Sequence, residues 1–228
     1  MASERRDARK FQRQRSRLVD QLRERGIKDE RVLKAIGRVP RHRFVEPALR
    51  GRAYEDAALP IGLSQTISQP FTVAYQTSLL DVEENDRILE VGTGSGYQAA
   101  VLCEMGARVF SVERHEELWK RTKQLLDDLG YDVRTKHGDG RNGWISFAPY
   151  HGIVVTAAAP EIPSPLLRQL REPISDGEGR GGRLVIPVGG PDGQTMNRIT
   201  RTGSGPHDYR REEFHTFRFV PLVEGAAD

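Results

Sequence analysis

Three glycines at alternate positions mark the part of the chain best suited to binding a ligand. Gly92, Gly94 and Gly96 follow the apolar run Ile88–Val91, and a helix-like stretch begins at Tyr97. Glycine permits a tight turn and the close approach of a ligand because it has no Cβ. The spacing is GxGxG, which is shorter than the GxGxxG of dinucleotide-binding proteins and disfavours NAD. On its own, such a trio could also be only a tight turn.

Two acidic residues follow the next two apolar runs. Glu113 ends a run about twenty residues after the turn, where a carboxylate can accept hydrogen bonds from both hydroxyls of a ribose. Asp139 follows the third run and could accept a hydrogen bond from an adenine amino group. Each has a simpler explanation, a solvated acid and an Asp-Gly turn. Because the carboxyl ends of parallel strands meet at one edge, the three features together predict a nucleoside site.

The elements that must position these residues follow from the pattern after residue 86. Short apolar runs alternate with helix-like stretches near 97–105, 115–129 and 164–171. Runs without strict alternation are typical of strands buried on both faces, and this spacing is typical of right-handed βαβ units. We therefore predict an α/β fold with a doubly wound, mostly parallel sheet and helices on both faces. The runs are RILEVG, ARVFSVE, DVRTKHGD, GIVVTAA and GRLVIPVG, and MNRITRT and EEFHTFRFVPL are expected to add an antiparallel pair.

The part before residue 86 is expected to be a helical extension of the same domain. Residues 18–50 have helical patterns, and a further helix is expected to begin at Pro70, because proline suits a first helical turn. The apolar side of that helix would hold Phe71, Ala74, Tyr75 and Leu79. Residues 59–69 have no clean period and are expected to form a loop. Residues 172–182 are rich in glycine and charge, and we expect a mobile loop there.

Composition limits the class of protein. The chain has 228 residues, 37% of them hydrophobic, and 23 further residues are glycine, which is typical of an ordinary globular domain. No apolar run approaches the ~18 residues of a membrane helix, and the Arg-rich N-terminus has no apolar stretch behind it. A single cysteine, Cys103, excludes an intrachain disulfide and a multi-cysteine metal site. We expect a cytoplasmic protein with no membrane partner and no metal.

Charge divides the chain unevenly. The net charge is +3, but residues 1–17 alone carry seven basic and two acidic residues, so the remainder carries −2. We therefore predict a basic arm over 1–17 and a single domain over 18–228, which comprises a helical part (18–82) and an α/β core (86–228). The arm is expected to be a solvated or helical tail, or else a docking element for an acidic partner. The slightly acidic body counts against a stable nucleic-acid partner.

The glycine spacing, Glu113 and Asp139 together resemble the S-adenosylmethionine-dependent methyltransferases. The segment Leu59–Phe71, LPIGLSQTISQPF, is similar to the signature loop (59–70) of the protein-L-isoaspartate (D-aspartate) O-methyltransferases. The resemblance extends over about residues 18–223, although the basic arm and residues 172–182 are longer than is usual in the family. The further matching motifs are GIKDERVLKAIGRVPRHRF, LEVGTGSGYQAAVL, FSVER, HGDG, IVVTAAAPEIP, LVIPVG and RFVPL.

This resemblance implies transfer of a methyl group from S-adenosyl-L-methionine to the α-carboxyl of L-isoaspartyl residues in damaged proteins and peptides. S-adenosyl-L-homocysteine is the product, and the methyl ester then loses methanol to form a succinimide that can reopen to aspartate. The acceptor carboxylate is already ionised at pH 7, so the reaction needs alignment and exclusion of water rather than a strong base.

The resemblance also implies roles for single residues. The family's active-site serine falls on Ser68, which we expect to donate to the carboxylate or to the loop backbone; from the bare sequence it would be an N-cap for the helix at Pro70. The expected substrate-binding residues are Thr66, Ile67, Ser68, Val220 and Pro221. The expected donor-binding residues are Gly92, Thr93, Gly94, Ser95, Gly96, Glu113, Asp139, Gly140 and Thr156.

Other classes of function stay open at this point. An RNA methyltransferase could use the basic arm as an electrostatic anchor. A sensor could bind the methyl donor without catalysis, although the intact loop around Ser68 argues against this. An NAD-dependent dehydrogenase is disfavoured by the glycine spacing. We expect a monomer whose partners are isoaspartyl-containing proteins and peptides.

Overall fold

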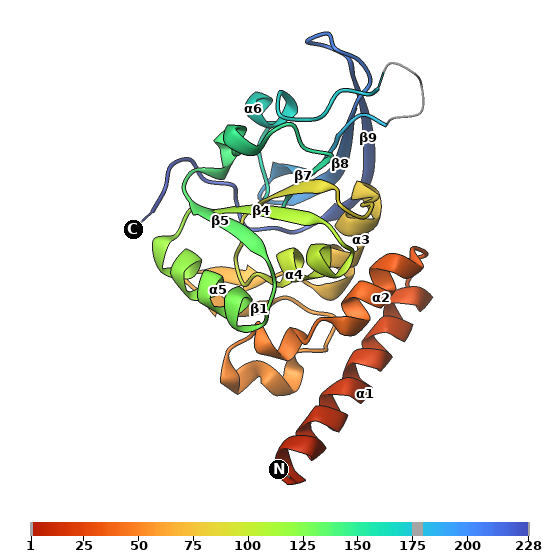
Figure 1. Ribbon diagram of the computed structural model, residues 1–228, viewed down its shortest axis with the longest axis vertical. Helices are drawn as coiled ribbons and strands as arrows, with labels where there is room; N and C mark the ends of the chain where they lie inside the picture. The colour runs from red at the N-terminus through yellow and green to blue at the C-terminus, as the bar shows by residue number, and fades with distance from the viewer. Residues whose placement is uncertain (1, 175–179, 228) are drawn as a thin grey trace.

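A computed structural model describes residues 2–174 and 180–227 (Figure 1). Residues 175–179, the centre of the predicted loop over 172–182, lie outside the described residues. The described part forms a seven-stranded sheet, a two-stranded hairpin and helices packed on both faces of the sheet. Within it, no helix combines the length and apolar character that crossing a bilayer requires.

The central sheet confirms the predicted α/β fold. Its strand order is β5-β4-β3-β6-β7-β8-β9, in which the first five strands are parallel and β8 is antiparallel to both of its neighbours, β7 and β9. The chain moves outward from β3 in one direction and then resumes on its other side at β6. Open sheets bind ligands at such a switch point. The strands are β3 (Arg87–Val91), β4 (Arg108–Glu113), β5 (Val133–His137), β6 (Gly152–Val155), β7 (Arg183–Gly190), β8 (Gly193–Arg201) and β9 (Tyr209–Phe217).

Helices cover the two faces unequally. On one face lie α3 (Pro70–Leu80), α4 (Tyr97–Glu104) and α5 (Glu116–Asp128), whose apolar side chains pack on the sheet and on one another. The other face is covered by the short helix α6 (Ser164–Leu167) and by 3-10 turns at 140–142 and 145–147 (Figure 1). The helix expected over 164–171 is therefore shorter than predicted. Leu170 instead forms an isolated parallel bridge with Tyr150.

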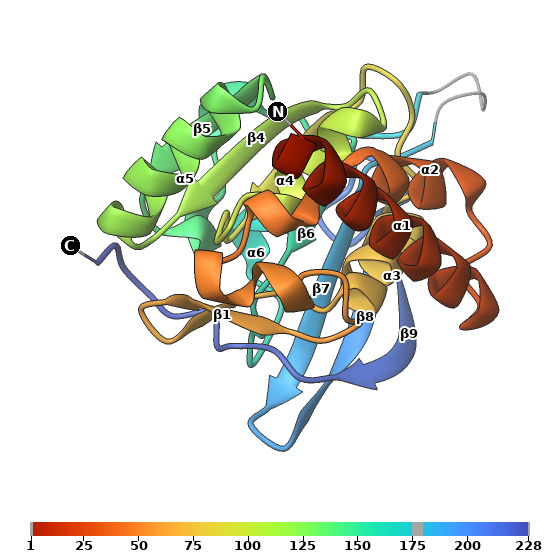
Figure 2. The same ribbon diagram turned by 90° about the horizontal axis from the view of Figure 1, so that it is seen from below.

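The last predicted strand also ends early. β9 stops at Phe217, and residues 218–227 run as an extended segment across the carboxyl edge of the sheet (Figure 2). Ala158 holds this segment, because its N–H donates to the Val220 carbonyl (2.7 Å) and its own carbonyl accepts from Leu222 (2.6 Å). The far end is fixed where the Ala227 N–H donates to the Arg114 carbonyl (2.7 Å).

The N-terminal helices pack against the α4 side of the molecule. Helix α1 (Ala2–Glu24) is continuous through residue 17, so the predicted division between arm and domain falls inside a helix. Its C-terminal half buries Leu18 and Leu22 in a cluster with Leu33 of α2 (Glu30–Arg38). The N-terminal end projects from the body (Figure 1), and further along the helix the Phe11 ring stacks on that of His42 (4.0 Å). Two 3-10 turns, Arg41–Arg43 and Pro47–Arg52, connect this layer to the hairpin.

The prediction of a loop over 59–69 is wrong. Residues Leu59–Gly62 form β1 and Gln65–Ile67 form β2, an antiparallel hairpin. Leu59, Ile61 and Ile67 are buried, so the short strands alternate after all. Both residues of the turn, Leu63 and Ser64, have positive φ (51° and 56°), the conformation that suits a two-residue hairpin. The sequence gives no sign of this turn, because neither of its two residues is glycine or asparagine.

The buried side of α3 is more polar than predicted. Phe71, Tyr75 and Leu79 are only half-buried, whereas Gln76 is fully buried. The Gln76 side chain donates to the carbonyl of Val155 (2.9 Å), the last residue of β6. At the end of a strand, some backbone carbonyl groups have no hydrogen-bond partner in a neighbouring strand. Here the polar side chain of Gln76 provides one for Val155.

Candidate functional site

The glycine turn lies at the switch point of the sheet, between the carboxyl ends of β3 and β6. Gly92 directly follows β3 with φ of 93°, and a Cβ there would collide with Oγ1 of Thr156, which follows β6. The Thr156 hydroxyl donates to the Gly92 carbonyl (2.7 Å). The glycine is therefore required both for its backbone conformation and for the close contact between the two loops.

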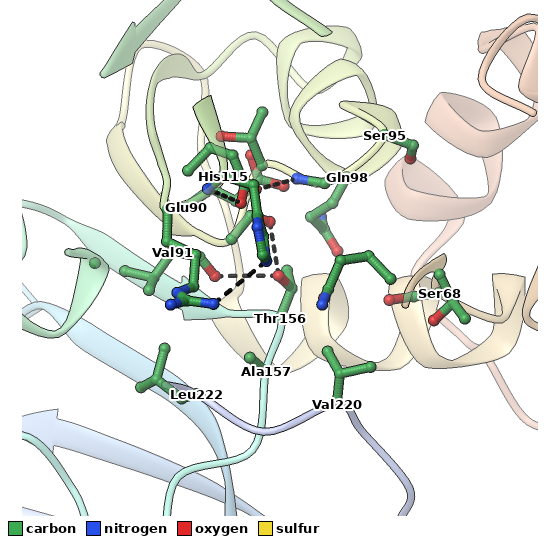
Figure 3. Close-up of a pocket in the computed structure, with 18 of the residues that line it drawn as sticks. Ser68, Glu90, Val91, Ser95, Gln98, His115, Thr156, Ala157, Val220 and Leu222 are labelled. Atoms are coloured by element: carbon green, nitrogen blue, oxygen red, sulfur yellow. Dashed lines mark hydrogen bonds between the residues drawn. The ribbon is translucent and has the colours of Figure 1, made fainter. Parts of the chain in front are cut away.

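A cavity opens beside this turn and encloses about 880 Å³, including its open mouth. The structure brings most of the predicted site residues to its walls: Gly92, Thr93, Gly94, Ser95, Glu113, Gly140 and Thr156 from the predicted donor site, and Thr66, Ile67, Ser68, Val220 and Pro221 from the predicted substrate site. Figure 3 shows Ser68 and Ser95 on one side of this cavity and Glu90, Val91 and His115 on the other.

Glu113 is buried at the end of β4, with 4% of its surface exposed. One carboxylate oxygen accepts the Gly94 N–H (2.8 Å), and the other accepts the His115 N–H (3.0 Å). A carboxylate offers about four acceptor positions, so two contacts leave it able to accept from a ligand. Glu113 thus links the glycine turn to the strand end and faces the cavity at the same time.

Two predicted donor-site residues lie behind the cavity wall. Asp139 accepts the N–H groups of Arg141 (2.9 Å) and Gly225 (3.0 Å), so it caps a 3-10 turn and holds the C-terminal segment. The wall beside it is formed by Gly140, and a contact between Asp139 and an adenine amino group stays a prediction. Gly96 begins α4 with φ of 85°, packed against Thr122.

Glu90 is a cavity residue that the sequence analysis missed. Its side chain is fully buried in β3 and accepts from the Ser111 hydroxyl (2.5 Å), which also contacts the Thr93 hydroxyl (2.6 Å). Burial, with the nearby negative charge of Glu113, raises the pKa of Glu90 to about 8. The signal in the sequence was an acidic residue among the apolar residues of the run RILEVG. Burying an acid costs free energy unless it has a hydrogen-bond partner.

Two buried acceptor oxygens on residues that line this cavity have no hydrogen-bond partner among the described residues. They are Oε1 of Glu90 and Oε1 of Gln98. Buried polar groups are normally paired, so unpaired acceptors on a cavity wall fit a ligand that donates hydrogen bonds. The ammonium group and positive sulfur of S-adenosyl-L-methionine match this electronegative lining, and its nucleoside matches the glycine turn with Glu113.

A second, wider groove meets the first cavity. Its walls share four residues with the first cavity, Thr66, Ser68, Thr156 and Val220. The groove then continues between the start of α3 and the end of β9, past Arg25, Asp56, Phe71, His215 and Arg218. The two cavities therefore meet at three residues with a predicted substrate role, Thr66, Ser68 and Val220, and at Thr156, for which a donor role is predicted.

The start of α3 argues against the simpler reading of Ser68. The N-cap residue is Gln69, whose side chain makes no capping bond, so the interpretation of Ser68 as a helix cap is wrong. Asp56 caps the helix from outside it, because its carboxylate accepts hydrogen bonds from the backbone N–H of Phe71 (2.8 Å) and from the side-chain amide of Gln69 (3.2 Å). Arg25 forms an ion pair with Asp56 and lies over the Phe71 ring, 4.0 Å from its centre.

The mostly parallel sheet, the glycine turn after β3 and the buried acid at the end of β4 define a methyltransferase of the S-adenosylmethionine-dependent class. Comparison with known proteins narrows this class. The sequence profile described as Protein-L-isoaspartate(D-aspartate) O-methyltransferase (PCMT) matches residues 13–227. The chain belongs to this family.

Relatives and solved structures agree with that membership. A protein-L-isoaspartate O-methyltransferase of Salinibacter ruber is 72% identical over 96% of this chain and 95% of its own length. One from Christiangramia forsetii is 50% identical over 96% of this chain and 98% of its own. A solved protein-L-isoaspartate O-methyltransferase structure superposes with a TM-score of 0.78 at 26% identity and covers 92% of this chain and 66% of that chain. A Plasmodium falciparum beta-aspartate methyltransferase (PCMT) in complex with S-adenosyl-L-homocysteine shares the fold, with a TM-score of 0.76 at 23% identity, over 92% of this chain and 98% of that chain.

Proposed function

We propose that the cavity at the glycine turn holds the methyl donor and that the adjoining groove holds an isoaspartyl segment of a damaged protein. The protein is an S-adenosylmethionine-dependent protein-L-isoaspartate O-methyltransferase, a protein-repair enzyme. The observation that supports the residue assignment is that Thr66, Ser68, Thr156 and Val220 line both cavities. A methyl group can pass directly between two ligands only where their sites meet.

When bound, S-adenosyl-L-methionine supplies an activated methyl group on a positively charged sulfur. Glu113 and the glycine turn hold the nucleoside end, and Glu90 with Gln98 accept from the amino-acid end. These contacts lie away from the junction of the two cavities, which is formed by the four residues that line both. They therefore fix the position of the transferring carbon without touching the acceptor. Correct placement of two reactants is the main contribution that this reaction requires.

At the junction, the acceptor carboxylate arrives already ionised, so the chain needs no base there. Ser68 donates its hydroxyl hydrogen to one carboxylate oxygen and leaves the other free to take the methyl group. Ile67, Val220 and Pro221 form apolar walls that exclude water from this oxygen. A less hydrated carboxylate is a stronger nucleophile.

Separate variants of the two sites test this assignment. Glu113→Ala removes a charged partner of the donor, so donor affinity should fall by roughly 10- to 150-fold while the KM for peptide stays near its native value. Arg218→Ala removes an exposed cation that lines the groove and not the donor cavity. The KM for peptide should therefore rise several-fold while donor affinity stays unchanged. Calorimetry with S-adenosyl-L-homocysteine and peptide kinetics give both values. If both variants changed the same constant, the two-site assignment would fail.

We further propose that the protein acts as a cytoplasmic monomer. Both cavities are built from one chain, so no second copy is needed to complete them. Sedimentation of the active protein at assay concentrations measures the oligomeric state directly.

A further inference from the structure

A row of cationic side chains begins where β3 and β4 start, at the edge of the sheet opposite the glycine turn, and continues along β5. Arg87 begins β3 and is the direct neighbour of Arg108, which begins β4. On the next strand, Arg134 is the neighbour of Phe110. Residues two apart on a strand share a face, so Arg108 and Phe110 point the same way, and Lys136 extends the row beyond Arg134.

Aromatic rings hold this row on the face that α4 and α5 leave uncovered. The Phe147 ring lies 4.7 Å from that of Phe110, and the guanidinium of Arg134 lies 5.1 Å from the Phe147 ring centre. The Lys136 ammonium lies 5.9 Å from the ring of Trp144, and Arg87 donates to the Phe147 carbonyl. The short turn at 144–147 therefore contacts three of these cations, Arg87, Arg134 and Lys136.

Counter-charges are scarce around these groups. Among the described side chains, Arg87, Arg108, Arg134 and Lys136 form no ion pair within 4.0 Å. The first three, together with Arg38, line a shallow cavity of about 1600 Å³, including its open mouth. The acidic side chains lining it are Asp132 and Glu104, and Glu104 is already paired with Arg38 (3.6 Å).

We propose that this cavity is a second ligand site and that it binds a compact polyphosphate, an anion with two or more linked phosphate groups. A concave cationic surface concentrates the field that attracts anions, and the guanidinium fork matches phosphate oxygens in pairs. Strand spacing places the backbones of Arg87 and Arg108 about 4.8 Å apart and that of Arg134 roughly 8 Å from Arg108. Cations at this spread suit linked phosphates better than a single one.

The rings favour this ligand over single-stranded nucleic acid. Nucleic-acid platforms need open aromatic faces on which bases stack. Here Arg134 lies against Phe147, Lys136 lies against Trp144, and Phe110 is buried. The site is therefore built to hold phosphate groups, which either inorganic polyphosphate or the tail of a nucleoside triphosphate can supply.

Calorimetric titration with inorganic triphosphate tests the proposal. The native protein should bind it saturably, and Arg108→Gln with Arg134→Gln should weaken binding by about 100-fold or more, since two charged hydrogen-bond donors are lost. The matched control removes the same charge from exposed positions of α1, as Arg13→Gln with Arg17→Gln, and should leave the affinity for triphosphate unchanged. Both double variants should bind S-adenosyl-L-homocysteine as the native protein does, which shows that the fold is intact.

Further titrations distinguish the source of the phosphate. Equal affinities for triphosphate and ATP would indicate that the phosphates alone are recognised, and tighter binding of ATP would indicate a nucleotide; each supports the site if it depends on Arg108 and Arg134. Absence of saturable binding at millimolar triphosphate would overturn the proposal. An equal loss of triphosphate affinity in the α1 double variant and in the Arg108 and Arg134 double variant would also overturn it. Displacement of triphosphate by S-adenosyl-L-homocysteine would place it in the donor cavity instead. Tighter binding of a single-stranded oligonucleotide through Trp144 would make this a nucleic-acid surface.

Discussion

At the scale of single residues, the cavity is marked by side chains whose polar groups are not satisfied by the protein. Glu90 is the clearest case, because it is buried with one oxygen unpaired and with its pKa raised to about 8. An apolar side chain of similar size would be more stable at this place in β3. The proposed donor site accounts for the polar residue, because a ligand that donates a hydrogen bond would pair the free oxygen of Glu90.

The raised pKa of Glu90 predicts a pH dependence of stability. Its ordinary pKa is 4.5, so between about 4.5 and 8 the folded protein keeps a proton that the unfolded chain has lost. The free energy of unfolding should therefore fall as pH rises through this interval, by at most about 1.4 kcal/mol per pH unit. Glu90→Gln should lack this component. Urea unfolding from pH 5 to 8.5 compares the two proteins, and parallel profiles would show that Glu90 does not titrate in this range.

Ser68→Ala should lower turnover and leave donor binding unchanged. The hydroxyl lies at the junction of the two cavities and does not cap α3, so its removal should slow single-turnover transfer by about 10- to 1000-fold at saturating donor. The melting temperature should not change. Ser64→Ala, in the exposed turn of the same hairpin, is the matched control. A native rate in Ser68→Ala would move the acceptor contact to Thr66 or the backbone.

At the scale of elements, the junction depends on how α3 and the hairpin are tied to the N-terminal layer. Asp56 is the tie, since it accepts from the first turn of α3 and pairs with Arg25 just after α1. Asp56→Ala should lower stability by about 1 to 2 kcal/mol, as loss of a helix cap does, and should lower turnover without changing donor affinity. Asp56→Asn keeps an oxygen that can accept the Phe71 N–H and should recover most of the stability.

The neighbouring Glu55→Ala is the control for this prediction. Glu55 pairs only with exposed Arg52 among the described residues, so its removal should change neither stability nor turnover appreciably. Thermal melts and single-turnover rates measure both variants. If Asp56→Ala and Glu55→Ala behaved alike, Asp56 would not position the acceptor loop.

Elements built from long apolar runs were predictable, whereas those set by tertiary contacts were not. The strands around RILEVG and ARVFSVE are buried on both faces, so their hydrophobicity alone identifies them. The hairpin at 59–67 escaped prediction because its strands are short and its turn residues, Leu63 and Ser64, adopt positive φ without being glycine. The polar face of α3 escaped for a similar reason, since Gln76 is paired by a strand end distant in sequence.

At the scale of the whole molecule, the lining of the cavity at the glycine turn was predictable, and most of the adjoining groove was not. The cavity lining follows from strand ends that the α/β topology brings together, as for Gly92, Glu113 and Thr156. The groove is assembled from Arg25, Asp56 and the end of β9, which no local pattern connects. Glu90 could have been found, because an acid inside an apolar run is itself a signal.

We propose that the two cavities together transfer a methyl group to an isoaspartyl carboxylate. The most direct test is single-turnover transfer of a labelled methyl group, at saturating donor, to two peptides that differ only in an isoaspartyl or aspartyl linkage. An isoaspartyl linkage adds a methylene to the backbone and moves the free carboxylate, so only this peptide should place its oxygen at Ser68. The isoaspartyl peptide should be labelled rapidly and its aspartyl counterpart almost not at all. Equal labelling of the two peptides would contradict the proposal.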